Sequence, residues 1–278
     1  MKIKTLIEQS SRPLVMGIVN LTPDSFSDGG QFNQLDSALN QVEKMLEAGV
    51  DMIDLGGEST RPGAEYVEAE EERRRVIPAI KAIRKHFDVP ISIDTYKPEI
   101  MQDVIELGVE MINDIRALEM PGALDVLAQS DTEVCLMHMQ GNPVTMQLAP
   151  KYDNVIENVL DYLNNRLQVC ESKGIDKSRI ILDPGFGFGK TVEHNYQLLA
   201  EFNRFKALGC SLLAGLSRKS MLGAVVDKAP AERVAASLSG AVICALNGAD
   251  IIRVHDVAQT IDALKVVEAM LKEKKNNE

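Results

Sequence analysis

Residues able to bind or transfer a charged group recur at the carboxyl ends of short apolar segments of this chain. In chain order they are Asn20, Asp54, Asp94, Asn113, His138, Asp183, Ser217, Arg218, Lys219, Arg253 and His255. Carboxylates and amides can exchange hydrogen bonds with a flat heterocycle that carries N–H groups. Lysine and arginine can hold carbonyl or phosphate oxygens, and arginine can also stack on a ring face. The residue types therefore indicate a site for a heterocycle with an anionic group.

Each of these residues also has an ordinary structural interpretation. Asp54 or Asp183 could simply cap the turn after its segment, and His138 is more simply a hydrogen-bonded histidine of the core. An apolar segment that closes on a hydrogen-bonding residue, repeated along the chain, is hard to obtain from packing alone, so the whole set favours a ligand site. A zinc site is not expected, because the histidines show neither H-x-H nor H-E-x-x-H spacing.

The segment D-P-G-F-G-F-G-K-T at residues 183–191 looks like a nucleotide-binding loop but has the wrong spacing. A P-loop requires glycine at the position that Pro184 occupies. Its glycines, at 185, 187 and 189, follow the pattern G-x-G-x-G, whereas a dinucleotide-binding fold requires G-x-G-x-x-G. We therefore expect neither an ATPase nor a dinucleotide enzyme. Instead, Pro184 and the glycines should turn the chain sharply so that Phe188 can form an apolar wall, and Lys190 should only begin the next connection.

The elements that would position these residues alternate along the chain. Short apolar segments predict eight strands, at residues 14–20, 51–57, 91–95, 111–115, 134–139, 180–185, 211–217 and 250–256. The connections could hold helices, most clearly at residues 36–48 and 68–83. Near-continuous apolar strands are typical of a parallel sheet that is buried on both faces. Eight such units in 278 residues favour an α/β fold, a single (β/α)8 TIM barrel, over a doubly wound sheet.

The rest of the chain indicates one domain over residues 1–278, with its core at about 13–267 and a frayed tail at 272–278. Long loops follow strands 1 and 2, at residues 21–30 and 58–66, and we interpret them as active-site loops. The apolar segment at residues 236–246 could be a buried barrel helix or part of a dimer contact.

The composition limits where the protein acts and what it binds. A formal net charge of −11 argues against general nucleic-acid binding and against attachment to anionic membranes. The four cysteines form no C-x-x-C pair and fit reduced thiols in the cytoplasm. No signal peptide is evident, and the longest uncharged run, residues 234–249, is short for a membrane span. We expect a soluble, cytoplasmic protein.

A series of motifs resembles the dihydropteroate synthase family of bacterial folate synthesis. In the order that this family shows, they are VNLTPDSFSDGG, DLGGESTRPGA, IDTYKP, INDI, LMHMQGNPVTMQ, LDPGFGFGKT, GLSRKSMLG and IIRVHDV. They cover nearly the whole chain, from about residue 13 to residue 267. NLTPDSFSDGG alone is shared with the wider pterin-binding superfamily, including folate-dependent methyltransferases. ESTRPGA, SRKSMLG and RVHDV together favour the synthases.

The resemblance implies a TIM barrel that condenses 6-hydroxymethyl-7,8-dihydropterin diphosphate with p-aminobenzoate, with Mg²⁺ as the cofactor. The products would be 7,8-dihydropteroate and diphosphate. It also implies a homodimer and a target of sulfonamides. Asn20 with Asp24, Ser25 or Asp28 offers hard oxygens for Mg²⁺, although the same residues suit an Asx turn.

The resemblance further assigns roles to individual residues by motif. The residues implied for the pterin pocket are Asp94, Asn113, Asp183, Lys219 and Arg253. Those implied for the diphosphate are Asn20, Arg253 and His255, with Asn20 also at the metal. Those implied for p-aminobenzoate are Thr60, Arg61, Pro62, Phe188 and Ser217. Those on a first loop that closes over the reacting centre are Phe26 and Asp28.

The residues that we expect to be catalytic are Asp94, Lys219 and Arg253. In a dissociative displacement at the pterin methylene carbon, a carboxylate such as Asp94 would stabilise the positive charge, and Mg²⁺, Arg253 and His255 would stabilise the leaving diphosphate. The aniline nitrogen needs positioning more than deprotonation, so we expect no essential general base.

Three alternatives remain open at this point. A folate-dependent methyltransferase would use the same barrel, but a corrinoid module would be expected nearby. A non-catalytic pterin-binding homologue should have lost loop or cationic residues. An unrelated enzyme acting on a sugar phosphate would explain SRKS and RVHD but not the acidic strand ends.

Overall fold

Eight parallel strands close into a barrel in the computed structural model, which describes residues 2–22, 31–59, 63–142 and 145–276. Neighbouring strands pair in chain order, and β8 returns to pair with β1. The strands are β1 (Leu14–Asn20), β2 (Met52–Gly56), β3 (Ile91–Asp94), β4 (Met111–Asp114), β5 (Glu133–Met137), β6 (Ile180–Asp183), β7 (Ser211–Ala214) and β8 (Ile251–Val254). The predicted TIM barrel and its eight strands are therefore confirmed, although several strands end earlier than expected.

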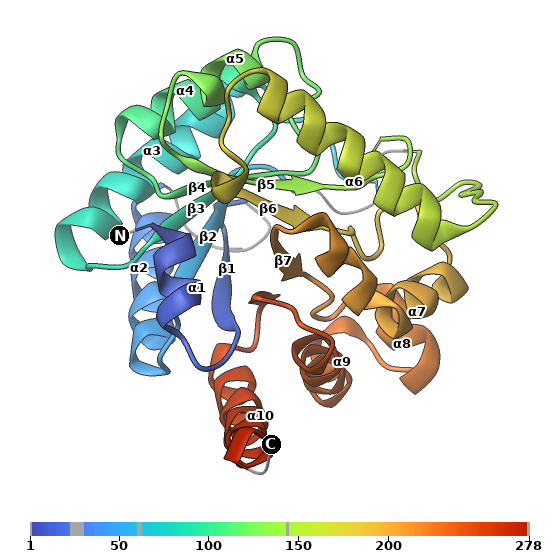
Figure 1. The fold of residues 1–278 in the computed structure, drawn as a ribbon. Helices are drawn as coiled ribbons and strands as arrows, with labels where there is room; N and C mark the ends of the chain where they lie inside the picture. The colour runs from blue at the N-terminus through green and yellow to red at the C-terminus, as the bar shows by residue number, and fades with distance from the viewer. Residues whose placement is uncertain (1, 23–30, 60–62, 143–144, 277–278) are drawn as a thin grey trace.

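Helices surround the strands (Figure 1) and follow them along the chain. They are α1 (Ile3–Gln9), α2 (Gln31–Glu47), α3 (Ala69–His86), α4 (Pro98–Glu106), α5 (Ala123–Ala128), α6 (Val155–Ser172), α7 (Val192–Ala200), α8 (Ser220–Val226), α9 (Val234–Leu246) and α10 (Val257–Asn276), with short 3₁₀ turns at Lys177–Arg179, Phe202–Leu208 and Pro230–Glu232. The helices expected at residues 36–48 and 68–83 correspond to α2 and α3. No helix within the described ranges is long and apolar enough to cross a membrane.

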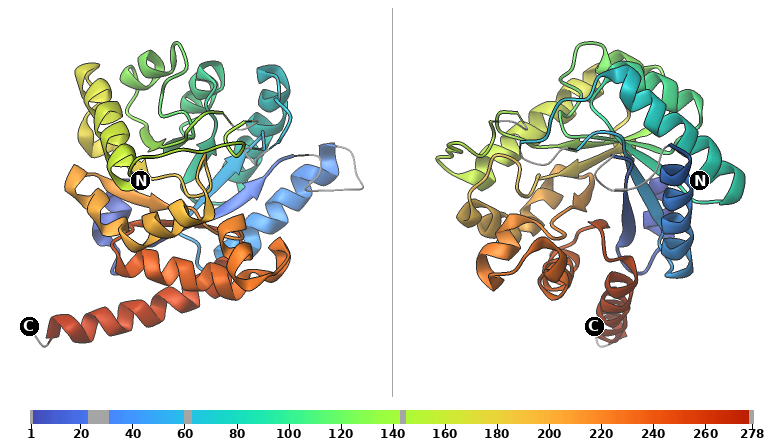
Figure 2. Two further views of the ribbon diagram at one scale, coloured as in Figure 1. Left: turned by 90° about the vertical axis from the view of Figure 1, so that its right-hand side faces the viewer. Right: turned by 180° about the vertical axis from the view of Figure 1, so that it is seen from behind.

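The C-terminal helix is longer than the sequence indicated. α10 continues to Asn276 and so includes residues 272–276 of the tail that we expected to be frayed. In the left view of Figure 2 its last turns extend beyond the body of the barrel. Val266 and Met270 are exposed on this helix.

The interior of the barrel has two layers that come from the same strands. Alternate residues of a strand face the same side, so a residue and the one two positions later both point inward. The layer nearer the amino-terminal ends of the strands is the lower one, and the end at which the strands finish is the upper end, or mouth. The lower layer is an apolar cluster that includes Met52, Met111, Ile181 and Ile251. Two positions further on, the same four strands carry Asp54, Asn113, Asp183 and Arg253. The strand periodicity therefore places the polar residues above an apolar floor.

The amino-terminal helix closes the lower end, which the sequence analysis did not predict. Ile3 of α1 is fully buried in the lower apolar cluster. The Glu133 carboxylate, at the start of β5, accepts the backbone N–H groups of Ile3 at 2.5 Å and of Lys4 at 2.9 Å. A carboxylate is favourable at this position because the N-terminus of a helix carries unpaired N–H groups. The folded core thus begins before residue 13.

Candidate active site

Four polar side chains from β2, β3, β4 and β8 meet above the apolar floor. The Arg253 guanidinium donates from Nε to Asp54 Oδ2 at 2.6 Å and from Nη2 to Asp94 Oδ2 at 2.9 Å. Asn113 Nδ2 donates to the same Asp54 oxygen at 3.2 Å. The structure therefore brings together three of the residues implied for the pterin pocket. Asp54, which the sequence placed at a strand end without a role, connects them.

Two carboxylate oxygens of this cluster have no hydrogen-bond partner within the described residues. They are Oδ1 of Asp54 and Oδ1 of Asp94, and both are buried. A buried acceptor without a donor costs about 1–3 kcal/mol, so such groups are uncommon unless a ligand or water satisfies them. These oxygens are suited to accept N–H groups from a bound heterocycle.

Burial and neighbouring charges have opposite effects on the pKa values of Asp94 and Arg253. Burial raises the pKa of Asp94 to about 7, although the Arg253 guanidinium opposes the rise. Burial also disfavours the charge on Arg253, yet the carboxylates of Asp54 and Asp94 raise the pKa of this arginine above its ordinary value. Arg253 therefore stays charged, while Asp94 can change its charge near neutral pH.

The opposite side of the barrel mouth carries two further charged residues, Asp183 and Lys219. Asp183, at the end of β6, is buried, and its Oδ1 accepts the N–H of Gly185 at 2.7 Å. Lys219 Nζ donates to the carbonyl oxygen of Phe186 at 2.5 Å and lies 4.6 Å from the centre of the Phe188 ring. Burial lowers the pKa of Lys219 to about 8, although the Asp183 carboxylate opposes the change.

The glycine-rich segment after β6 turns sharply, as expected, and presents Phe188 to an apolar cluster. Gly185 has φ +74°, and a Cβ atom there would lie 1.9 Å from the carbonyl oxygen of His138. Only glycine fits a backbone that is both left-handed and this close to another strand end. The apolar residues that surround Phe188 are Tyr96, Ile115, Met137 and Met146. Phe188 therefore lies in an apolar cluster at the mouth of the barrel, and its role as a wall for a substrate stays a prediction.

His138 is a core histidine, as the sequence favoured. It is buried, and burial together with the nearby Lys190 ammonium lowers its pKa to about 2. Its Nδ1 lies 2.9 Å from Lys190 Nζ. The sequence did not predict that Lys190, expected only to begin the next connection, would lie inside the protein.

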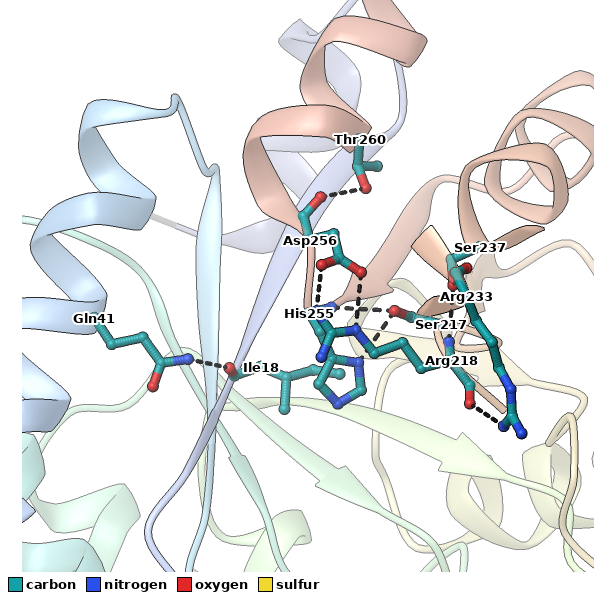
Figure 3. Close-up of polar contacts among 9 residues, drawn as sticks. All are labelled: Ile18, Gln41, Ser217, Arg218, Arg233, Ser237, His255, Asp256 and Thr260. Atoms are coloured by element: carbon teal, nitrogen blue, oxygen red, sulfur yellow. Dashed lines mark hydrogen bonds and ion pairs between the residues drawn. The ribbon is translucent and has the colours of Figure 1, made fainter. Parts of the chain in front are cut away.

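The turns after β7 and β8 are joined by two contacts (Figure 3). Ser217 Oγ lies 3.1 Å from His255 Nδ1 and accepts the backbone N–H of His255 at 3.2 Å. The Arg218 guanidinium forms a bidentate pair with Asp256, with Nε and Oδ2 separated by 3.0 Å. Ser217, implied for p-aminobenzoate, is therefore in contact with His255, implied for the diphosphate.

The backbone of Arg218 is also held by Ser237 of α9 and by Arg233, the residue before this helix (Figure 3). Its N–H donates to Ser237 Oγ at 2.9 Å, and its carbonyl oxygen accepts from Arg233 Nη1 at 2.9 Å. These contacts accompany a left-handed backbone at Arg218, with φ +59°, which is unfavourable for an arginine. The turn that carries Ser217 and Lys219 is therefore tied to its neighbours on both sides.

The remaining predicted residues lie at the mouth or outside the described residues. Asn20 ends β1, opposite Gly56 of β2, and Gly56 is opposite Asp94 of β3, so Asn20 and Asp94 share one row across three strands. In the part of the chain that the structure describes, no three His, Cys, Asp or Glu side chains form a metal-binding group. The predicted residues outside the described ones are Asp24, Ser25, Phe26, Asp28, Thr60, Arg61 and Pro62.

Comparison with known proteins gives one consistent family. Residues 16–255 match the family model described as pterin binding enzyme. The dihydropteroate synthase of Escherichia coli (strain K12) is 53% identical over 266 residues, which cover 96% of this chain and 94% of that protein. The chain is thus similar to this relative over nearly the whole length of both.

Solved structures agree with the sequence relatives. The Yersinia pestis dihydropteroate synthase with a sulfonamide drug complex has a TM-score of 0.90 and 49% identity, over 94% of this chain and 95% of that one. The Xanthomonas albilineans dihydropteroate synthase with 4-aminobenzoic acid has a TM-score of 0.89 and 48% identity, over 94% and 93% of the two chains. Both have the fold described above.

Proposed function

This chain belongs to the pterin-binding enzyme family and, within it, to the dihydropteroate synthases, and from this premise we propose how its own residues carry out the reaction. The substrates are 6-hydroxymethyl-7,8-dihydropterin diphosphate and p-aminobenzoate, and the products are 7,8-dihydropteroate and diphosphate. The observation that carries the proposal is the group of buried carboxylates above the barrel floor, two of whose oxygens lack a donor among the described residues.

The pterin ring is recognised through its N–H groups. Asp94 and Asp183 lie on opposite sides of the mouth and supply acceptors, while Asn113 can both donate and accept. A neutral heterocycle that brings several donors satisfies these buried acceptors without adding a buried negative charge. A sugar phosphate would instead place further hydroxyl oxygens and charge against two carboxylates.

Arg253 has to divide its donors between the protein and the substrate. Its Nε is bound by Asp54 at 2.6 Å, which fixes the base of the guanidinium. Its Nη2, which binds Asp94 at 2.9 Å, can turn to the diphosphate when the pterin takes the place at Asp94. This exchange keeps Arg253 charged and paired throughout, so that no isolated buried charge is created.

The reaction proceeds by dissociative displacement at the pterin methylene carbon. As the bond to the diphosphate oxygen breaks, the ionised Asp94 stabilises the positive charge, and Arg253 with His255 stabilises the negative charge on the leaving group. Contact with Ser217 orients the His255 ring. The amine of p-aminobenzoate needs to be positioned against the carbon, and the Phe188 wall with Ser217 supplies that side of the pocket.

Mg²⁺ would be held at this site by Asn20 together with the substrate. Mg²⁺ is usually bound by few protein oxygens together with substrate phosphates and water, and Asn20 at the end of β1 offers one such amide oxygen. When bound, the ion supplies Lewis-acid stabilisation of the leaving diphosphate.

The enzyme acts as a cytoplasmic homodimer in this proposal. The four cysteines are free thiols, which suits a reducing compartment. α9 packs one face on the barrel through Gly240, Ala241 and Cys244, and it exposes Ile243 and Leu246. Together with the exposed apolar residues of α10, these side chains offer an apolar surface for a second copy.

The proposal is tested by measuring diphosphate release from pterin diphosphate and Mg²⁺, with and without p-aminobenzoate. Release that depends on p-aminobenzoate and matches dihydropteroate formation supports the synthase. Binding of the pterin diphosphate without turnover would contradict it and favour a non-catalytic or methyl-transferring member of the superfamily. Arg253→Ala should weaken diphosphate binding, and unchanged affinity for the pterin diphosphate would remove Arg253 from the anion site.

A further inference from the structure

Lys190 is a buried lysine that the reaction above does not use. It is only 2% exposed and follows the glycine-rich turn after β6. Its Nζ donates to the carbonyl oxygens of Gly185 at 2.8 Å and Phe188 at 3.1 Å, and it lies 2.9 Å from His138 Nδ1. An ammonium group has three N–H donors, and it finds one short acceptor for each.

The hydrogen bonds of Lys190, rather than its charge, account for a lysine at this position. No carboxylate accepts a hydrogen bond from Lys190 within the described ranges, and its burial penalises the charged form. An apolar side chain of similar length would avoid that penalty. Such a replacement would, however, leave the Phe188 carbonyl oxygen and His138 Nδ1 without the Lys190 donor, whereas the Gly185 carbonyl oxygen would keep the N–H of Phe188 at 3.2 Å. The hydrogen bonds of Lys190 therefore hold the loop in one conformation.

The two lysines of the site hold this loop from different directions. Lys190 binds the carbonyl oxygens of Gly185 and Phe188, whereas Lys219 binds that of Phe186, between them in the chain. The Phe188 ring then lies beneath Lys219 Nζ, 4.6 Å away. The place of the ring thus depends on a backbone that Lys190 fixes.

His138 links Lys190 to the end of β5. His138 Nδ1 lies 2.9 Å from Lys190 Nζ, and the lowered pKa of His138 keeps its imidazole neutral. The ring packs edge-on against Tyr162, with centroids 5.0 Å apart. Tyr152 adds a further contact by donating to the carbonyl oxygen of Gly189 at 2.8 Å. The loop after β6 is therefore anchored to the strand beside it.

We infer that Lys190 is a positioning residue for the p-aminobenzoate side of the pocket, acting through the backbone of Phe188; this rests on the proposed function. The pterin side depends less on Lys190, because Asp183 lies within β6 and its carbonyl oxygen accepts the N–H of His138 at 2.9 Å. Loss of Lys190 should therefore affect the two substrates unequally.

The test compares Lys190→Met with the control Lys173→Met, which removes an exposed lysine paired with Asp125. We expect Lys190→Met to raise the KM for p-aminobenzoate about tenfold or more, with a much smaller change in the KM for the pterin diphosphate. The control should change neither constant. An unchanged KM for p-aminobenzoate, or equal changes for both substrates, would overturn the inference.

A second pair of variants covers the case in which Lys190→Met does not fold. His138→Leu removes the acceptor of the Lys190 ammonium, whereas His138→Asn can restore an acceptor near Nδ1. We expect the Leu variant to raise the KM for p-aminobenzoate and the Asn variant to recover most of the loss. Equal behaviour of the two variants would count against the inference. Absence of turnover in the unaltered enzyme would instead overturn the proposed function.

Discussion

The two ends of the barrel interior use the same strands in opposite ways. At the lower end, Ile3 seals an apolar cluster, and both N–H groups at the start of α1 find an acceptor in Glu133. At the upper end, Asp54 and Asp94 each keep a buried oxygen without a donor among the described residues. The polar groups of the lower end are paired within the protein, whereas the upper end leaves two buried acceptors for a ligand or water.

This difference separates what stabilises the fold from what performs the chemistry. Apolar burial at the lower end contributes to folding in proportion to the area removed from water. Buried charges at the upper end oppose folding unless they are paired, and sites of function are where such violations are expected. Substitutions at the two ends should therefore change different measurements.

The largest effect is expected at the upper end, from Asp94→Asn. The amide keeps the shape of the carboxylate but cannot stabilise positive charge on the methylene carbon, so kcat should fall by about 10²- to 10³-fold. The midpoint of thermal unfolding should change little, because one buried charge is removed while Asp54 still pairs with Arg253. Steady-state kinetics and thermal unfolding of the same preparation measure both. A comparable loss in p-aminobenzoate binding would argue against this role for Asp94.

A smaller effect is expected at the lower end, from Ile3→Ala, which should change stability and leave the kinetics unchanged. Removing the buried side chain should lower the free energy of unfolding by about 2–3 kcal/mol, through lost burial and a cavity. Both KM values and kcat should stay unchanged under conditions where the variant is folded. Urea unfolding and kinetics provide the measurements, and Lys4→Ala, on the exposed side of α1, is the matched control. Altered kinetics in folded Ile3→Ala would show that the two ends are coupled.

The smallest effect concerns pH and sharpens the account of the upper end. The raised pKa of Asp94, about 7, means that the needed carboxylate is lost as the pH falls below this value. The lowered pKa of Lys219, about 8, means that the needed ammonium is lost as the pH rises above that value. The kcat/KM for the pterin diphosphate should therefore be greatest between about pH 7 and 8. It should fall about tenfold per pH unit below and above this range.

The alkaline side of this profile can be assigned with Lys219→Arg. Arginine stays charged at every pH at which the protein is folded, so the fall above pH 8 should disappear or move upward. Persistence of the same fall in this variant would assign it to another group. Asp94→Asn should remove the acidic side in the same way.

Local sequence patterns were enough to predict the barrel and much of its mouth. Each strand is an apolar run that can only be buried, and the residue that ends it is placed at the mouth once the strands are parallel. Asp94, Asn113, Asp183, Lys219 and Arg253 were found in this way, together with the family resemblance, and the structure brings them to one end of the barrel. Phe188 lies in an apolar cluster with residues of neighbouring strand ends, whereas its role as a substrate wall stays a prediction.

Contacts between distant parts of the chain could not be predicted in this way. The pair between Asp54 and Arg253 joins residues 199 positions apart, and it exists only because β8 closes on β1 beside β2. The sequence of α1 is that of a short amphipathic segment. Its place in the core follows only from the closed barrel, in which Ile3 is buried in the lower apolar cluster. From the sequence, Lys190 only begins a connection. The folded turn brings the carbonyl oxygens of Gly185 and Phe188 to its Nζ.

The sequence by itself thus determined the type of each element and the chemistry available at the strand ends, because periodicity and residue type act over a few neighbouring residues. The tertiary structure alone decided which charges pair, which oxygens stay without a donor, and which lysine faces the pocket and which lies behind it. Those outcomes depend on the closure of the barrel, which brings side chains from eight strands within hydrogen-bonding distance of one another.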